Sequence, residues 1–171
     1  ILLFWAAKDI DGFRCDMAEM VPVEFWGWAI PQVKEQYPAI IFIAAVYNPH
    51  EYRNYIFNGH FDYLYDKVGL YDTLRALTCG HETATNIPFR WQSLSGIEKH
   101  MLNFLENHDE QRIASEFFAG NPFKAIPAMV VSACMNTNPV MVYFGQELGE
   151  AGMDEEGFSG RDGRTTIFDY W

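Results

Sequence analysis

Apolar and polar positions along the chain follow two alternating periods, which predict strands separated by helices. Continuous apolar runs, typical of strands buried on both faces of a parallel sheet, recur between stretches with helical spacing. The predicted strands are residues 10–16, 39–46, 61–65, 101–106 and 140–144, and the predicted helices are residues 1–8, 23–36, 50–58, 71–78, 83–95, 109–118 and 122–136. We expect Pro31 to kink its helix or shift its start. This alternation predicts parallel β–α units and an α/β fold.

Two of the predicted strands end in carboxylates. Arg14 and Asp16 stand two residues apart, so a strand places both side chains on one face. The cation would keep the carboxylate ionised, as a nucleophile or a charge stabiliser requires. An isolated pair of this kind is typically a surface ion pair, but Asn107, His108 and Asp109 follow another strand-like run. Together they indicate one pocket at the carboxyl ends of a parallel sheet.

Three segments together resemble the α-amylase family, glycoside hydrolase family 13. Residues 12–16 (Gly-Phe-Arg-Cys-Asp) resemble the strand with the family's nucleophile, and residues 104–109 (Phe-Leu-Glu-Asn-His-Asp) resemble its last catalytic stretch. Residues 41–49 stand where the acid/base strand belongs, but Ala45 occupies the position of the family's glutamate. The flanking residues 24–28 and 60–67 resemble most closely the surface starch-degrading amylases of gut bacteria.

The resemblance covers essentially the whole chain and implies the fourth to eighth strands of a (β/α)8 TIM barrel. Residues 1–171 would then be one partial catalytic barrel domain, without the N-terminal part of the barrel and the C-terminal β domain. Half a barrel leaves two strand edges and one sheet face uncovered, so we expect the missing half of the barrel as a partner. The resemblance also implies an extracellular or cell-surface location, with the signal region outside this chain.

Retaining glycoside hydrolysis needs two carboxyl groups about 5–5.5 Å apart, one to attack the sugar carbon and one to protonate the leaving oxygen. The resemblance makes Asp16 the nucleophile, with Arg14 beside it. It makes Asp109 the carboxylate that grips the sugar hydroxyls in the distorted transition state. It also implies that His108 and Asn107 bind the same sugar.

Ala45 cannot donate or take a proton, and loss of a general acid/base typically lowers a rate by roughly 10²–10⁴-fold. Glu19 and Glu106 are interpreted as structural rather than as substitutes. Tyr47 either stacks on the leaving-group sugar or packs at the barrel rim. The implied function is retaining, endo-acting hydrolysis of α-1,4-glucans such as starch and maltooligosaccharides, in a form inactivated at Ala45. Deliberate substitution and a naturally degenerate copy both explain this residue.

Two other classes of function stay open. One is a non-catalytic starch-binding or interaction protein built on an amylase-like barrel, although such a role would not require an intact Asp16. The other is a metal-dependent hydrolase using Asp16, His108 and Asp109, which needs more ligands than the sequence offers. The resemblance alone does not separate hydrolases from glucanotransferases, because loops and the missing half of the barrel decide the acceptor.

Composition narrows the partners further. The 171 residues carry a net charge of −11, which makes nucleic acid a poor partner. No apolar run has the length of a transmembrane helix. No cofactor is assigned, and calcium is allowed in a longer parent chain without any ligand assigned here. The acidic run at residues 154–156 is interpreted as a solvated loop.

Several single residues are given structural interpretations. Cys15, Cys79 and Cys134 lack metal-ligand spacing and are interpreted as buried free thiols. Trp26 and Trp28 face different sides of their helix, and both are interpreted as core rather than as a platform for sugars. Arg112 could pair with Asp109 or Glu106 at the site, but a surface ion pair is the favoured interpretation.

Overall fold

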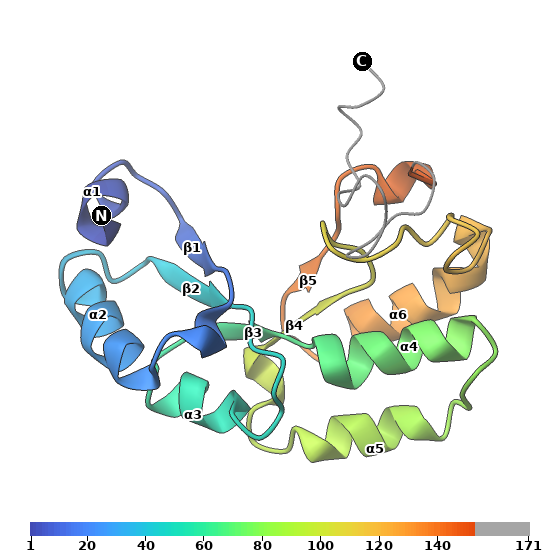
Figure 1. Ribbon diagram of the computed structural model, residues 1–171, viewed down its shortest axis with the longest axis horizontal. Coiled ribbons are helices and arrows are strands. Elements are labelled where there is room, and N and C mark those ends of the chain that lie inside the picture. The colour runs from blue at the N-terminus through green and yellow to red at the C-terminus, as the bar shows by residue number, and fades with distance from the viewer. Residues whose placement is uncertain (153–171) are drawn as a thin grey trace.

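The computed structural model describes residues 1–152, and in them five parallel strands form one sheet in the order β1-β2-β3-β4-β5 (Figure 1). Each strand pairs with the next one along the chain, as in the register that aligns Gly12 with Ile41 and Cys15 with Ala44. The strands are β1 (Gly12–Cys15), β2 (Ile41–Ala44), β3 (Tyr63–Tyr65), β4 (Met101–Phe104) and β5 (Val140–Met141). This half-barrel confirms the predicted α/β fold and partial TIM barrel.

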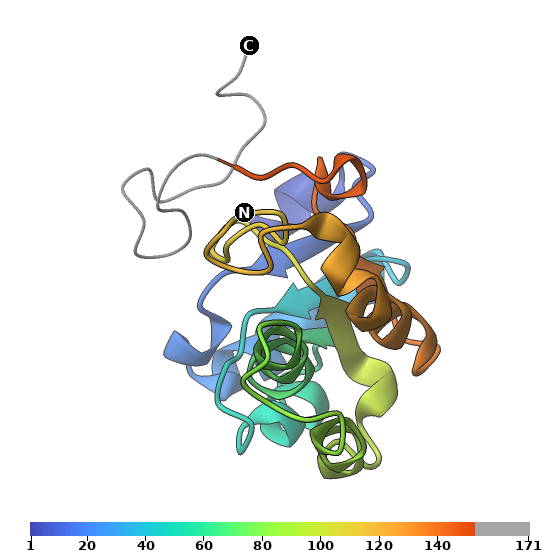
Figure 2. The same ribbon diagram turned by 90° about the vertical axis from the view of Figure 1, so that its right-hand side faces the viewer.

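Helices connect the strands and pack beside them. They are α1 (Leu2–Ala6), α2 (Val23–Gln36), α3 (Tyr52–Phe57), α4 (Asp72–Thr78), α5 (Asn86–Ser93) and α6 (Ile126–Cys134). Short 3-10 turns occupy Ala18–Met20, Glu98–His100, Pro122–Ala125 and Gln146–Leu148, and a π turn occupies Lys67–Tyr71. Figure 2 shows α4, α5 and α6 in front of the sheet. The helix α2 has the predicted bounds, with Pro31 inside it rather than at its start.

Side chains alternate between the two faces of the sheet. Phe42 and Ala44 belong to a buried cluster with Trp26 and Ile30 of α2, so this face of β2 packs against the helix. Arg14 lies on the opposite face of β1, where its guanidinium is 5.5 Å from the ring centre of Tyr65 on β3. The alternation predicted from sequence therefore directs Arg14 away from the helical layer and toward the interior of the half-barrel.

Two predicted elements differ in the structure. Residues 109–118 form turns instead of a helix, because the side chains of Asn107 and Glu106 accept hydrogen bonds from backbone N–H groups of this segment. The strand predicted at residues 140–144 is limited to the half-buried Val140–Met141. The acidic run at residues 154–156 lies outside the described residues.

Three interpretations of single residues are also corrected. Trp26 is buried, but Trp28 is 64% exposed, because residues two apart on α2 face different sides and one of these sides points to solvent. The three thiols are free, but Cys15 alone of them is buried, while Cys79 is half-buried and Cys134 is exposed.

Among the described residues, no helix is long and apolar enough to cross a membrane.

Candidate active site

The carboxyl ends of β1, β2 and β4 open into a cavity of about 570 Å³. Of the seven site residues predicted from sequence, five line this cavity, together with four residues that were not predicted as site residues. Its lining residues are Asp16, Met17, Glu19, Met20, Ala45, Tyr47, His108, Asp109 and Glu110. Arg14 and Asn107 are not among the lining residues and lie directly next to ones that are. Segments more than 90 residues apart in sequence thus meet at one edge of the sheet, as the strand pattern predicts.

Asp16 stands at the tip of β1. The next residue, Met17, has a left-handed backbone with φ 45°, which is uncommon for a residue with a side chain and turns the chain sharply out of the strand. Nη1 of Arg14 lies 2.6 Å from Oδ1 of Asp16. Burial lowers the pKa of Arg14. Hydrogen bonds with Tyr65 and Asp16 raise it, and together they outweigh burial, so the pKa is higher than the usual value. Asp16 therefore has a permanent cation beside it.

Residue 45 is fixed by the backbone on both sides. The N–H of Ala45 donates to the carbonyl of Cys15 at 3.1 Å, and its carbonyl accepts from the N–H of Ala18 at 3.2 Å. These bonds place the residue 45 side chain next to Asp16, on the neighbouring strand. The side chain there is a methyl group, which supplies no proton and accepts none.

Glu19 connects the two strand ends. Its Oε2 accepts hydrogen bonds from the backbone N–H groups of Tyr47 at 3.2 Å and Asn48 at 3.1 Å. These contacts agree with the structural interpretation of Glu19. Its place in the cavity wall was not predicted, and the nearest sign in the sequence is that it follows Asp16 by three residues.

Tyr47 lines the same cavity with its phenol. Burial raises the pKa of Tyr47 to about 12, and the nearby carboxylate of Asp109 adds to the effect. The hydroxyl is therefore a neutral donor at neutral pH, in the same cavity as Ala45.

Asn107 shapes the turn that carries His108 and Asp109. Its side chain is buried, and its Oδ1 accepts hydrogen bonds from the backbone N–H groups of Asp109 and Glu110, both at 2.8 Å. Nε2 of His108 lies 3.2 Å from Oδ2 of Asp109. The structure thus places Asn107 under the cavity, where it orients the two residues that line it.

Glu110 is a lining residue that the sequence reasoning missed. Its carboxylate accepts a hydrogen bond from the hydroxyl of Tyr71 at 3.0 Å and lies 3.2 Å from Nζ of Lys67. Nη1 of Arg75 is 3.6 Å away. These partners come from the segment between β3 and the end of α4, so only the folded structure reveals them. The one sequence feature that pointed to the cavity was the position of Glu110 next to Asp109.

Arg112 pairs with Glu106, as one of the two alternatives from sequence allowed, and does not form the favoured surface ion pair. It is fully buried, with Nη1 2.8 Å from Oε2 of Glu106 and Nη2 donating to the carbonyl of Phe144 at 2.8 Å. The prediction was wrong because the segment after Asp109 folds back over β4 instead of running outward as a helix. Burial raises the pKa of Glu106, while the N–H of Ile113 and the guanidinium of Arg112 oppose this. Glu106 is thus engaged in the core, away from the cavity.

No group of three or more His, Cys, Asp and Glu side chains within residues 1–152 is arranged to hold a metal ion.

No protein-family model matches the chain. Two curated relatives align over most of it. An alpha-1,4-glucan:maltose-1-phosphate maltosyltransferase from Myxococcus xanthus is 22% identical over 139 residues, covering 81% of this chain and 17% of the relative. Neopullulanase 2 from Thermoactinomyces vulgaris is 24% identical over 158 residues, covering 87% of this chain and 26% of the relative. The chain therefore spans about a quarter or less of the length of these relatives.

Solved structures match the fold over almost the whole chain. The cyclic alpha-maltosyl-(1→6)-maltose hydrolase of Arthrobacter globiformis superposes with a TM-score of 0.79 at 21% identity, covering 99% of this chain and 38% of the hydrolase. An α-amylase from Geobacillus thermoleovorans superposes with a TM-score of 0.76 at 24% identity, covering 99% and 40%. The homologues and structural neighbours are enzymes of the α-amylase family, and glycoside hydrolases are among them.

Proposed function

We propose that residues 1–171 are part of the catalytic barrel of a retaining, endo-acting α-1,4-glucan hydrolase whose acid/base position is Ala45. The observation that carries this proposal is the cavity that Asp16, Ala45 and Asp109 share at the carboxyl ends of β1, β2 and β4 in one parallel sheet. The names of the relatives support the substrate class, since they include an α-1,4-glucan maltosyltransferase and a neopullulanase.

The cavity supplies most of a retaining mechanism. The carboxylate of Asp16 attacks the sugar carbon while the bond from this carbon to the leaving oxygen breaks, which gives a glycosyl ester of Asp16. The guanidinium of Arg14 lies 2.6 Å from this carboxylate and places a positive charge beside it. Asp109 and His108 hold hydroxyl groups of the same sugar, and Tyr47 stacks on the leaving-group sugar.

The missing step is proton transfer. The leaving oxygen needs a proton, and the water that later hydrolyses the ester needs a base. In the family pattern one carboxyl group at position 45 does both, and here the methyl of Ala45 does neither. We therefore propose that the chain binds glucans and cleaves them slower than an intact enzyme by roughly 10²–10⁴-fold, the usual contribution of a general acid/base.

The surroundings of the cavity support two further parts of the proposal. The inner face of the half-barrel is partly open, with Ile41 of β2 37% exposed, and we propose that the remaining strands of a complete barrel cover it. A polymeric substrate also agrees with action at the cell surface or outside the cell, where intact starch is found.

A binding-only function is the second candidate, and Ala45 is the observation that favours it. A protein that holds starch without cleaving it has no use for an acid/base. The intact pair of Arg14 and Asp16 favours the enzyme instead, because glucan binding does not require a carboxylate held beside a cation.

The test is to compare Ala45→Glu with the parent and with Ala45→Gln, in the longest natural chain that carries residues 1–171. On soluble starch, A45E should be faster by roughly 10²–10⁴-fold, while A45Q, with a side chain of the same size but no ionisable group, should stay near the parent. If A45E is inert and all forms are retained by starch in an affinity gel, the binding-only function replaces the enzyme. If none is retained, both proposals are wrong.

A further inference from the structure

Two aromatic side chains on the outer face of α2 are exposed to solvent. Phe25 is 42% exposed and Trp28 is 64% exposed, and their ring centres are 6.0 Å apart with planes tilted by 48°. Their spacing of three residues puts them on one side of the helix. Tryptophan and phenylalanine bury large apolar areas when they pack, so a pair left open on a helix marks a candidate binding surface.

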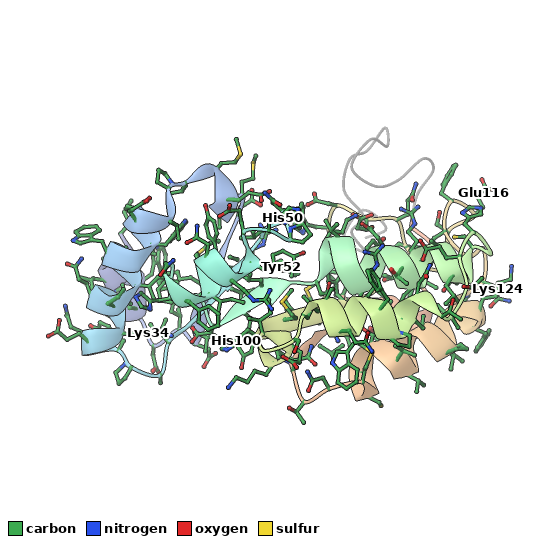
Figure 3. The ribbon with its side chains drawn as sticks, turned by 90° about the horizontal axis from the view of Figure 1, so that it is seen from below. Lys34, His50, Tyr52, His100, Glu116 and Lys124 are labelled. Carbon is green, nitrogen blue, oxygen red and sulfur yellow. The ribbon has the colours of Figure 1, made fainter. Side chains whose placement is uncertain are left out.

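A hollow of about 570 Å³ lies beside Trp28, between α2 and α3. Its lining residues are Val23, Glu24, Gly27, Trp28, Asn54 and Asn58. The two helices lie side by side in Figure 3, where Lys34 marks the C-terminal part of α2. A Cβ atom on Gly27 would lie 2.5 Å from the carbonyl oxygen of Asn58, so glycine is needed here for the end of α3 to come this close. The close approach brings Asn58 into the lining of the hollow together with Trp28.

The polar groups of this hollow are fixed in direction. The amide of Asn58 donates to Oδ1 of Asn54 at 2.9 Å, and the amide of Asn54 donates to Oε2 of Glu51 at 2.8 Å. This chain of hydrogen bonds orients both amides along α3. Glu24 adds a carboxylate, which accepts hydrogen bonds, at the first turn of α2.

The chemistry of the hollow selects one class of ligand. Its lining residues include no cation, so a phosphate or another anion finds no counter-charge and meets Glu24 instead. A purely apolar ligand would take water from the carboxylate of Glu24 and from the second N–H of each amide without offering a hydrogen bond in return. A sugar ring suits both parts of the site, because it has an apolar face of C–H groups and a rim of hydroxyl groups.

We propose that Phe25, Trp28 and the hollow beside them form a second α-glucan-binding site on the outside of the half-barrel. Trp28 stacks on the face of a sugar ring, Phe25 extends the platform to the next ring, and Asn58 and Glu24 hydrogen-bond to the hydroxyls. This site shares no lining residue with the catalytic cavity. The inference rests on the proposed function for its ligand class, an α-glucan, and it adds a surface that holds the polymer away from the reacting bond.

The test is retention by amylopectin in an affinity gel, with Trp28→Ala as the variant and Trp91→Ala as the matched control. Trp91 of α5 is also exposed, at 44%, and is not among the lining residues of the hollow. Loss of a central tryptophan from a binding site typically costs affinity about tenfold or more, so W28A should raise the dissociation constant for amylopectin by about tenfold, while W91A should not change it. W28F, which keeps a flat ring, should recover part of the loss.

Two further measurements separate this site from the cavity. Tyr47→Ala removes a ring from the cavity, so the effect of W28A should persist in the Y47A background. In the A45E background, W28A should leave kcat/KM on a short aryl maltoside unchanged, because that substrate is too small to reach the hollow. Thermal unfolding of W28A should match the parent, since the side chain is exposed.

The inference is overturned if W28A binds amylopectin as tightly as W91A does in both backgrounds. It is also overturned if W28A changes the sedimentation coefficient instead of glucan binding, because the aromatic face would then contact another protein chain. Failure of the proposed function looks different. In that case A45E stays inactive on the aryl maltoside, and the parent itself is not retained by amylopectin.

Discussion

Oε2 of Glu19 accepts a hydrogen bond from the backbone N–H of Tyr47 at 3.2 Å, which links the turn after β1 to the segment after β2. The same oxygen accepts from Asn48 at 3.1 Å, so one carboxylate holds two consecutive N–H groups in the cavity wall. The β–α units of Asp16 and Ala45 are therefore connected by a side chain as well as by strand pairing.

Removing this acceptor should weaken the fold. Glu19→Ala removes both hydrogen bonds, and a typical hydrogen bond stabilises a fold by about 0.5–1.5 kcal/mol. Tyr47 is half-buried and Asn48 is exposed, so water replaces part of what is lost. We expect a fall of about 1 kcal/mol in the free energy of unfolding, measured by urea denaturation. Glu19→Gln keeps an amide oxygen in place and should lose less than half as much. Equal losses for E19A and E19Q would show that the charge matters rather than the acceptor.

The parent protein should process a sugar whose leaving group needs no proton. With α-maltosyl fluoride, an oxygen of Asp16 bonds to the sugar carbon as the C–F bond breaks and fluoride leaves. This step needs no acid at position 45. We expect a burst of fluoride equal to the enzyme concentration, followed by slow turnover. Azide should speed the turnover by displacing the Asp16 ester, and the maltosyl azide formed should keep the original anomeric configuration.

Asp16→Asn is the control for this reaction. It removes the nucleophile but keeps the size of the side chain, so the burst should disappear and azide should have no effect. An azide product of inverted configuration, or an unchanged burst in D16N, would contradict the assignment of Asp16.

The buried ion pair of Arg112 and Glu106 should be sensitive to loss of one partner. Arg112→Ala would leave the carboxylate of Glu106, which is 2% exposed, without its counter-ion. Such changes typically cost about 3–5 kcal/mol of stability. The double variant R112A/E106Q should recover part of this loss in urea denaturation. Lys34→Ala breaks the partly exposed pair with Asp62 and should cost about 1 kcal/mol or less. Similar losses for R112A and K34A would contradict the role of burial.

Asp66 should make stability depend on pH. Its side chain is buried, and this raises its pKa to about 6, although N–H groups of Leu70 and Gly69 oppose the shift. The unfolded chain releases this proton near pH 3.9, so between about pH 4 and pH 6 the folded protein binds the proton more tightly. The contribution of Asp66 to the free energy of unfolding should therefore fall as pH rises through this window.

Asp66→Asn isolates this effect from other titrating groups. The difference in the free energy of unfolding between the parent and D66N, measured by urea denaturation from pH 4 to 7, should decline up to about pH 6 and then level off. A difference that rises with pH would mean that Asp66 is stabilised as a carboxylate.

Local spacing made much of the fold and the cavity predictable. The two-residue spacing of Arg14 and Asp16 places both at one strand end, and the helical spacing of residues 23–36 gives the bounds of α2. Asp16 and Asp109 could be assigned to one edge because parallel strands bring their carboxyl ends together. Each of these inferences needs only the order of elements along the chain.

What could not be predicted depends on contacts between distant segments. Arg112 is buried because the chain turns back over β4, and the turn is held by bonds from Glu106 and Asn107 that no periodicity reveals. Trp28 is exposed because the sheet covers only one side of α2. Glu110 enters the cavity wall through partners on another β–α unit. Burial is a property of the assembled layers, so a sequence pattern alone does not decide it.

The strand order has a consequence for the way the chain is made on the ribosome. Every strand pairs with the next one to be synthesised, so each β–α unit can join the growing sheet as soon as it emerges, without waiting for a distant partner. The cavity, in contrast, is complete only after residues from β1, β2 and β4 have all been synthesised. Asp16 is translated more than 90 residues before Asp109, so a nascent chain stopped before β4 contains the proposed nucleophile but lacks the residues that would hold the sugar.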